Sequence, residues 1–171
     1  MNNKYTSRKI GLMAVFVAIG LVLQYVENQI LITPVPGGKL GLSNIVTIIN
    51  IFVFGGRNAL LIAVLRSFLG TIVMGGVISA IYSVSGAVFS TVAMWLIKKY
   101  FYPRVSLVGI SIAGASVHNI TQLFVAAVTY KSIYVFSYLP LLLIIALLSG
   151  TATGYCARLF TNRVFKEKFL K

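Results

Sequence analysis

The chain has 171 residues, of which 58% are hydrophobic and only 10% are charged, and its mean hydropathy is +0.95. Soluble domains carry far more charge, so this composition excludes a water-soluble enzyme or binding module and indicates several membrane spans. The formal net charge is +13, but the basic residues punctuate apolar runs instead of gathering on one soluble face. This pattern favours contact with a lipid bilayer surface over binding to nucleic acid.

Six apolar segments follow one another along the chain, separated by turn-forming or basic stretches such as "GGRN" and "KKYFYPR". We therefore predict an all-α membrane protein with six transmembrane helices in a single domain, residues 1–171. The first segment continues into "VLQYVENQ" without a small-residue cleavage site, so we expect it to be retained. The second and third segments are short for a span of about 20 residues. The predicted spans are approximately residues 10–27, 42–56, 58–74, 77–97, 105–130 and 134–157.

The basic residues predict how the helices are oriented in the membrane. With the N-terminus in the cytoplasm, twelve of the fifteen Lys and Arg residues fall on the inner side, and only Lys39 and Lys131 fall on the outer side. Cytoplasmic loops characteristically carry this excess of positive charge. The sequence thus predicts that both termini are cytoplasmic.

Arg66 lies inside an unbroken apolar run, "AVLRSFLGT", at a position that places it near the bilayer centre. Small residues at neighbouring helical positions, Ala59, Ala63 and Gly70, would let another helix approach closely, so we expect Arg66 to face protein. One interpretation is structural: Arg66 pairs with Glu27 or caps backbone carbonyls. The other is an anionic ligand, because a guanidinium can donate two parallel hydrogen bonds to a phosphate or a carboxylate.

Further polar side chains occur in the second and fifth segments, at outer or middle depth in the membrane. For His118 alone, an interhelical hydrogen bond is favoured over a ligand contact. The first outer loop, which contains "PVPGGK", is interpreted as a lid, and its Lys39 either contacts an anion or is solvated. The predicted substrate-binding residues are Arg66, Lys39, Asn44, Thr47, Asn50, His118, Asn119 and Gln122.

Residues that could hold a metal or perform catalysis are scarce in this chain. It has one His, one Cys and two acidic residues in total, which falls short of a first coordination shell. "GGK" lacks the spacing of a nucleotide-binding phosphate loop. We therefore predict no metal site, no cofactor and no catalytic residue.

Small residues recur at helical spacing in the first and last segments. Gly11, Ala14 and Ala18 share one side of the first helix, and Gly150 and Gly154 share one side of the sixth. Such patterns usually mark helix packing, often within the same bundle.

Three stretches carry a family resemblance: "RKIGLMAVFVAIGLVLQYVE", "PVPGGKLGLSNIVTIINIFVFG" and "NALLIAVLRSFLGTIVMGG". Across nearly the whole chain, the sequence resembles the Gx transporter family, which is often labelled heptaprenyl diphosphate synthase component I. That family is similar to the substrate-binding S components of energy-coupling factor transporters, which are six-helix membrane proteins.

The resemblance implies a function and partners. This chain would be an S component in the plasma membrane of a bacterium, carrying a small anionic or amphipathic molecule such as a flavin or an isoprenoid-related compound. Ala14 and Ala18, extended by Gly11, match the Ala-x-x-x-Ala face that docks on the transmembrane T component of such transporters. Two ATPase subunits would supply the energy.

The family label suggests an alternative. Prenyl chain elongation uses aspartate-rich clusters to hold Mg²⁺ and a diphosphate, and this sequence contains no Asp. The chain could then be only a non-catalytic membrane accessory subunit of a polyprenyl diphosphate synthase. We expect a transport subunit in preference to this accessory subunit.

Overall fold

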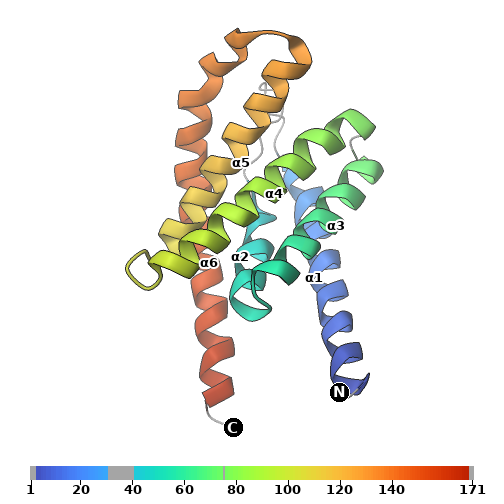
Figure 1. Cartoon of the computed structure of the whole chain (residues 1–171), viewed down its shortest axis with the longest axis vertical. Helices are drawn as coiled ribbons and strands as arrows, with labels where there is room; N and C mark the ends of the chain where they lie inside the picture. Colours follow the sequence, from blue (N-terminus) through green and yellow to red (C-terminus); the bar gives the residue numbers. More distant parts are fainter. Residues whose placement is uncertain (1–2, 31–40, 75, 170–171) are drawn as a thin grey trace.

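The structure is a computed structural model that describes residues 3–30, 41–74 and 76–169. Within these residues the chain forms six α-helices and one short 3₁₀-helix, with no strand (Figure 1). The loop that carries Lys39 lies outside the described residues. The elements are α1 (Asn3–Ile30), α2 (Asn44–Val53), α3 (Gly56–Met74), α4 (Gly76–Phe101), α5 (Leu107–Tyr130), η1 (Ile133–Tyr138) and α6 (Leu139–Phe169).

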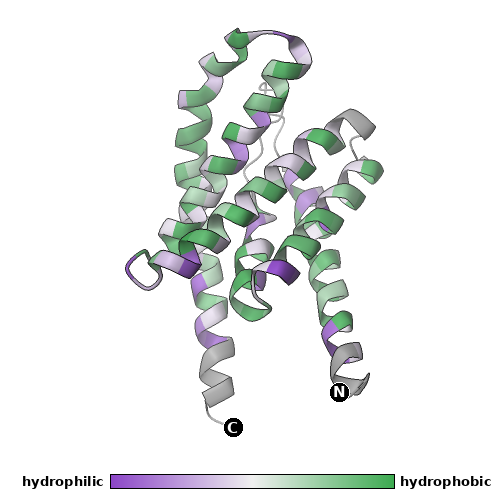
Figure 2. Cartoon of the chain, in the orientation of Figure 1, coloured by the Kyte–Doolittle hydropathy of each residue, from purple (hydrophilic) through white to green (hydrophobic). Residues whose placement is uncertain are grey.

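Every predicted apolar segment contains an α-helix, but the prediction of six transmembrane helices needs a correction. Five of the described helices are long and apolar enough to cross a membrane, whereas α2 has only 10 residues. These five helices expose large apolar side chains, as expected of surfaces that face lipid. Figure 2 shows that hydrophobic residues predominate along the helices. The chain is therefore an all-helical protein of membrane type.

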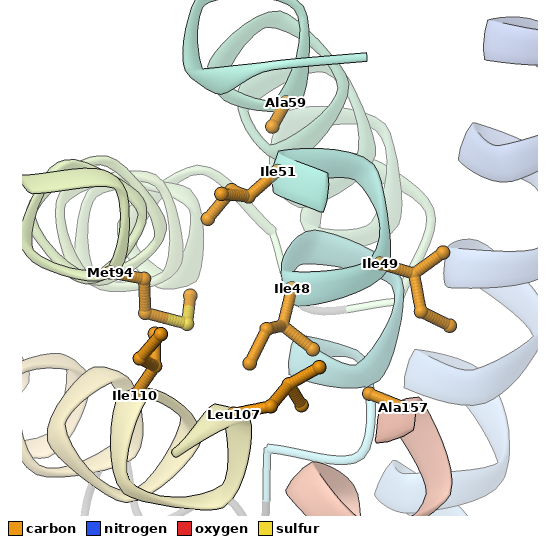
Figure 3. Packing of buried hydrophobic residues seen from close by; sticks show 8 residues of the cluster. All are labelled: Ile48, Ile49, Ile51, Ala59, Met94, Leu107, Ile110 and Ala157. Carbon is orange, nitrogen blue, oxygen red and sulfur yellow. The ribbon is translucent and has the colours of Figure 1, made fainter. Parts of the chain in front are cut away.

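The short helix α2 lies at the centre of the bundle, where it contacts each of the other five α-helices. Asn44, Thr47 and Asn50 recur at helical spacing on this otherwise apolar helix, and they are buried together with most of its apolar side chains. Figure 3 shows Ile48 and Ile51 of α2 pointing toward Met94 on α4 and Ile110 on α5. Because its neighbours enclose it, α2 does not need the length of a span.

Lys98 on α4 holds the C-terminal end of α2. Its Nζ donates a hydrogen bond to the carbonyl oxygen of Ile51 (2.8 Å) and lies 4.3 Å from the centroid of the Phe52 ring. The last carbonyls of a helix have no partner within the helix and form the negative end of its dipole. A lysine at this position satisfies one carbonyl and compensates that dipole.

Helices α5 and α6 form a tightly packed pair. A Cβ atom built on Gly150 of α6 would lie 2.6 Å from the Cα of Ile112 on α5, so glycine is needed for this approach. Ser111 and Thr153 hydrogen-bond across the interface at 2.8 Å. The predicted packing role of the small residues in α6 is thus confirmed, and it serves the bundle itself.

Both termini lie at the same end of the molecule, and the turns from α2 to α3 and from α4 to α5 lie toward that end (Figure 1). Arg57 begins α3, while Lys98 and Lys99 end α4 and Arg104 follows it. The basic residues of these turns therefore gather at the end that holds the termini. We call it the basic end.

Candidate functional site

Arg66 is buried at the interface between α3 and α1. Only 2% of the residue is exposed, and its side chain lies against Gly20 of α1, where an added Cβ would clash with Arg66 Cδ. Gly20 therefore provides the space that the arginine occupies. The expectation that Arg66 faces protein and not lipid is confirmed, because Ala59, Ala63 and Gly70 are buried on the same helix.

The charge of Arg66 is incompletely compensated by the described residues. Its Nε has no hydrogen-bond partner among them. Glu27 of α1 is close enough for an electrostatic interaction with Arg66. The Glu27 carboxylate also accepts a hydrogen bond from the backbone N–H of Gly41. Glu27 thus lowers the cost of burying the guanidinium.

Gln24 is a third member of this site, and sequence reasoning missed it. It is 2% exposed, and neither of its amide atoms has a hydrogen-bond partner among the described residues. A Cβ on Gly70 of α3 would lie 2.7 Å from the Gln24 side chain, so a glycine again makes room. The signal was present in the sequence, since Gly20, Gln24 and Glu27 recur at helical spacing on one face of α1.

We name Gln24, Glu27 and Arg66 the Arg66 cluster. It combines one permanently charged guanidinium with an amide that can both donate and accept, and several of its polar atoms are unused by the described residues. Buried polar atoms in proteins are normally hydrogen-bonded, and each exception requires an explanation. An anionic or polar group placed between α1 and α3 would satisfy Nε of Arg66 and the amide of Gln24.

Helix α2 contributes a further buried polar side chain, Asn50, which is fully buried and has no partner for either amide atom among the described residues. Thr47 and Asn44 are also buried on this helix. The three predicted polar residues of α2 are therefore all buried, and their role in binding stays a prediction. The structure adds that this lining lies inside the bundle, since α2 is enclosed by the other helices.

The three predicted residues on α5 are all buried, but they serve different interfaces. His118 faces α4, where a Cβ on Gly86 would lie 2.9 Å from its ring. Asn119 donates a hydrogen bond to the carbonyl oxygen of Leu142 on α6 (2.9 Å). Gln122 is 2% exposed and its amide has no partner among the described residues.

The structure does not place the α5 residues beside Arg66. Helix α4 packs against both α3 and α5, and within the described residues α3 and α5 do not pack directly against each other. Asn119 is committed to a structural hydrogen bond with α6. The predicted single lining thus divides into the Arg66 cluster, the centre of α2 and the α5 interfaces, and Lys39 lies outside the described residues.

The predicted docking residues lie on an open face of α1. Gly11, Ala14 and Ala18 are all exposed, and a Cβ built on Gly11 would meet nothing within 4 Å. Helix α1 packs on its other side against α3 and α2. Gly11, Ala14 and Ala18 thus lie outside the packed interfaces of the described bundle, in contrast to Gly150 and Gly154 of α6.

Most of this chain matches one known protein family. Residues 16–160 match the model of the family described as heptaprenyl diphosphate synthase component I. The chain belongs to this family. The match spans the helices from the middle of α1 to α6, including the Arg66 cluster and α2. No curated protein and no solved structure matches the chain.

The chemistry of the described residues agrees with a binding or assembly role. No group of three or more His, Cys, Asp or Glu side chains comes together to hold a metal ion in residues 3–30, 41–74 and 76–169. The described residues include a buried cation, Arg66, and the buried amides of Gln24, Asn50 and Gln122. They also include the exposed small residues Gly11, Ala14 and Ala18 on α1. A buried cation and buried amides are groups that can hold an anionic or polar ligand.

Proposed function

We propose that this protein is the non-catalytic membrane subunit of a heptaprenyl diphosphate synthase and acts together with a separate catalytic component. The observation that carries this proposal is the family match over residues 16–160. A protein described as component I implies a second component, and the residues of this chain suit the supporting role.

The acidic residues explain why the catalytic step would belong to the partner. Enzymes that transfer prenyl groups must hold Mg²⁺ and a diphosphate, and hard cations of this kind take carboxylate oxygens. The chain has two acidic residues, Glu27 and Glu167. Glu27 lies in α1 and accepts a hydrogen bond from Gly41, while Glu167 lies near the end of α6. Two acidic residues in the sequence are fewer than the carboxylate clusters that hold magnesium and a diphosphate.

A membrane subunit gives such a synthase a physical advantage. Its product joins a diphosphate to a chain of seven isoprene units, and each buried methylene favours the bilayer by about 0.8 kcal/mol. The product therefore partitions into the membrane as it grows. A bundle with five helices of spanning length would hold the catalytic component at the surface where this product enters the lipid.

The test is co-purification followed by an activity assay. The tagged full-length chain is isolated from native membranes in a mild detergent, and bound proteins are identified by mass spectrometry. We expect a soluble prenyl synthase to be recovered, and heptaprenyl diphosphate synthesis to require both proteins. Recovery of an energy-coupling ATPase module in its place, with a synthase that is fully active without this chain, would contradict the proposal.

The open face of α1 favours a second candidate, an S component of an energy-coupling factor transporter in a bacterial plasma membrane. Gly11, Ala14 and Ala18 are exposed at helical spacing, as a docking face for a transmembrane T component requires. In this candidate the Arg66 cluster binds the anionic group of the transported molecule, and two ATPase subunits drive transport.

A paired set of variants tests this candidate. The double change Ala14→Leu and Ala18→Leu fills the open face, whereas Val15→Leu with Ile19→Leu alters exposed residues that are already large. If α1 docks on a T component, only the first pair abolishes recovery of the T component and the ATPases in a pull-down. Undiminished recovery with the first pair would exclude this face as the docking site.

A further inference from the structure

A pocket of about 310 Å³ lies at the basic end of the bundle, where the turn between α4 and α5 meets α6. It is separate from the Arg66 cluster and contains none of the residues predicted from the sequence. The pocket is lined by Phe52, Tyr102, Pro103, Ser106, Leu107, Arg158, Thr161 and Asn162.

One wall of the pocket is cationic and rich in hydrogen-bond donors. Arg158 and Asn162 lie one turn apart on α6 and are both exposed. Thr161 donates its hydroxyl hydrogen to the carbonyl of Ala157 (2.6 Å), so within the pocket it acts as an acceptor. The guanidinium of Arg158 therefore supplies the positive charge, and its planar donors match a phosphate oxygen pair.

The start of α5 adds to the positive potential of this wall. Ser106 caps the helix, and its Oγ accepts a hydrogen bond from the N–H of Gly109 (3.1 Å). The first hydrogen bond along the helix runs from the N–H of Ile110 to the carbonyl of Ser106. The preceding N–H groups lie at the positive end of the helix dipole. None of the residues that line the pocket is acidic.

The opposite wall is aromatic. The rings of Phe52 and Tyr102 meet edge to face with their centroids 5.3 Å apart, and Lys98 Nζ lies 4.3 Å from the centroid of Phe52 on the Phe52 ring face. Because Phe52 lines the pocket, Lys98 places a second positive charge beside it. The pocket consequently joins an anion-binding wall to an apolar wall at the edge of the membrane-spanning region.

We propose that this pocket binds the diphosphate head of a prenyl diphosphate, with the start of its isoprenoid chain against Phe52 and Tyr102. This assignment rests on the proposed function, because a synthase supplies such a molecule. A phosphate head beside an apolar chain is also the chemistry of an anionic phospholipid. The experiment must therefore separate these two sources of the same group.

Binding is measured on the purified full-length chain in a neutral detergent, with farnesyl diphosphate as the probe. Arg158→Gln removes the charge and keeps a donor, and we expect it to raise the Kd about 10- to 100-fold, as the loss of a charge-assisted hydrogen bond does. Arg163→Gln is the matched control, because Arg163 is exposed on the same helix and does not line the pocket. An equal Kd for both variants, or binding of farnesol as tight as that of the diphosphate, would overturn the proposal.

The second arm repeats the measurement in nanodiscs of phosphatidylcholine, with and without phosphatidylglycerol. Retained binding of the probe in the presence of the anionic lipid supports the prenyl diphosphate. If phosphatidylglycerol displaces the probe and this displacement depends on Arg158, the pocket belongs to lipid headgroups and the prenyl assignment is overturned. Neither arm requires a catalytic partner, so a failed co-purification with intact binding would contradict the proposed synthase and leave the pocket established.

Discussion

Two helix interfaces of this protein use glycine for opposite purposes. Between α5 and α6, Gly150 and Gly154 bring two backbones together, and Ser111 and Thr153 share a hydrogen bond across the interface. Between α1 and α3, Gly20 and Gly70 make room for long polar side chains. A glycine in a membrane helix thus marks a close approach, and what approaches decides its role.

The difference in hydrogen bonding gives this comparison its functional meaning. Asn119 and Thr153 have partners on their own or a neighbouring helix, so these side chains of the α5–α6 interface behave as architecture. Arg66 Nε and the amide of Gln24 have none among the described residues. Unsatisfied polar groups in a membrane protein are costly and characteristically belong to a binding site. We therefore expect mutations at the two interfaces to have different consequences.

The largest effect is expected for Gly150→Leu at the α5–α6 interface. The new Cβ would lie 2.6 Å from the Cα of Ile112, and a backbone atom cannot move aside as a side chain can. We expect the two helices to separate, with a loss of about 3 kcal/mol in the free energy of unfolding. The measurement is reversible unfolding in detergent. Gly11→Leu is the control, since nothing lies within 4 Å of its Cβ, and equal stability of both variants would contradict the tight packing.

A smaller effect is expected for Gly20→Ala at the α1–α3 interface. The added methyl group meets the side chain of Arg66, which can adopt another rotamer, so the expected loss is about 1–2 kcal/mol. Gly11→Ala on the same helix should change stability by far less. The decisive measurement is a double-mutant cycle with Arg66→Ala, in which the cost of the Gly20 change should largely disappear. Additive costs would show that Gly20 does not hold the arginine.

The smallest effect on stability is expected for Arg66→Gln. Because Nε of Arg66 has no hydrogen-bond partner among the described residues, removal of the charge should change the free energy of unfolding by less than about 1 kcal/mol. Affinity for an anionic small molecule retained by the purified protein should fall about 10- to 100-fold.

Thermal unfolding with and without that molecule distinguishes the two interpretations of Arg66. A loss of about 3–5 kcal/mol in both conditions, with affinity unchanged, would identify Arg66 and Glu27 as a structural pair. In that case the α1–α3 interface would be architecture like α5–α6, and the contrast between them would fail.

Much of the fold could be predicted from the sequence because its signals are local. Apolar runs and their interruptions revealed each helix, and the small residues beside Arg66 indicated that it faces protein. The second segment was recognised as short for a span, but its place at the centre of the bundle and the extension of α6 to Phe169 were missed. The length of a helix inside a bundle depends on the neighbours that enclose it, and periodicity within one segment does not report on them.

The candidate site was predictable in part for the same reason. The sequence alone determined that this is a helical membrane protein with one buried arginine and polar side chains in two apolar segments. Only the tertiary structure decided that Arg66 lies against Gly20 and near Glu27, that Asn119 is bonded to α6, and that Arg158 lines a pocket with Tyr102. Helical periodicity shows which residues share a face, because it arises from the local backbone geometry. Which face lies opposite is set by packing between helices that are distant in the chain, and no local pattern encodes it.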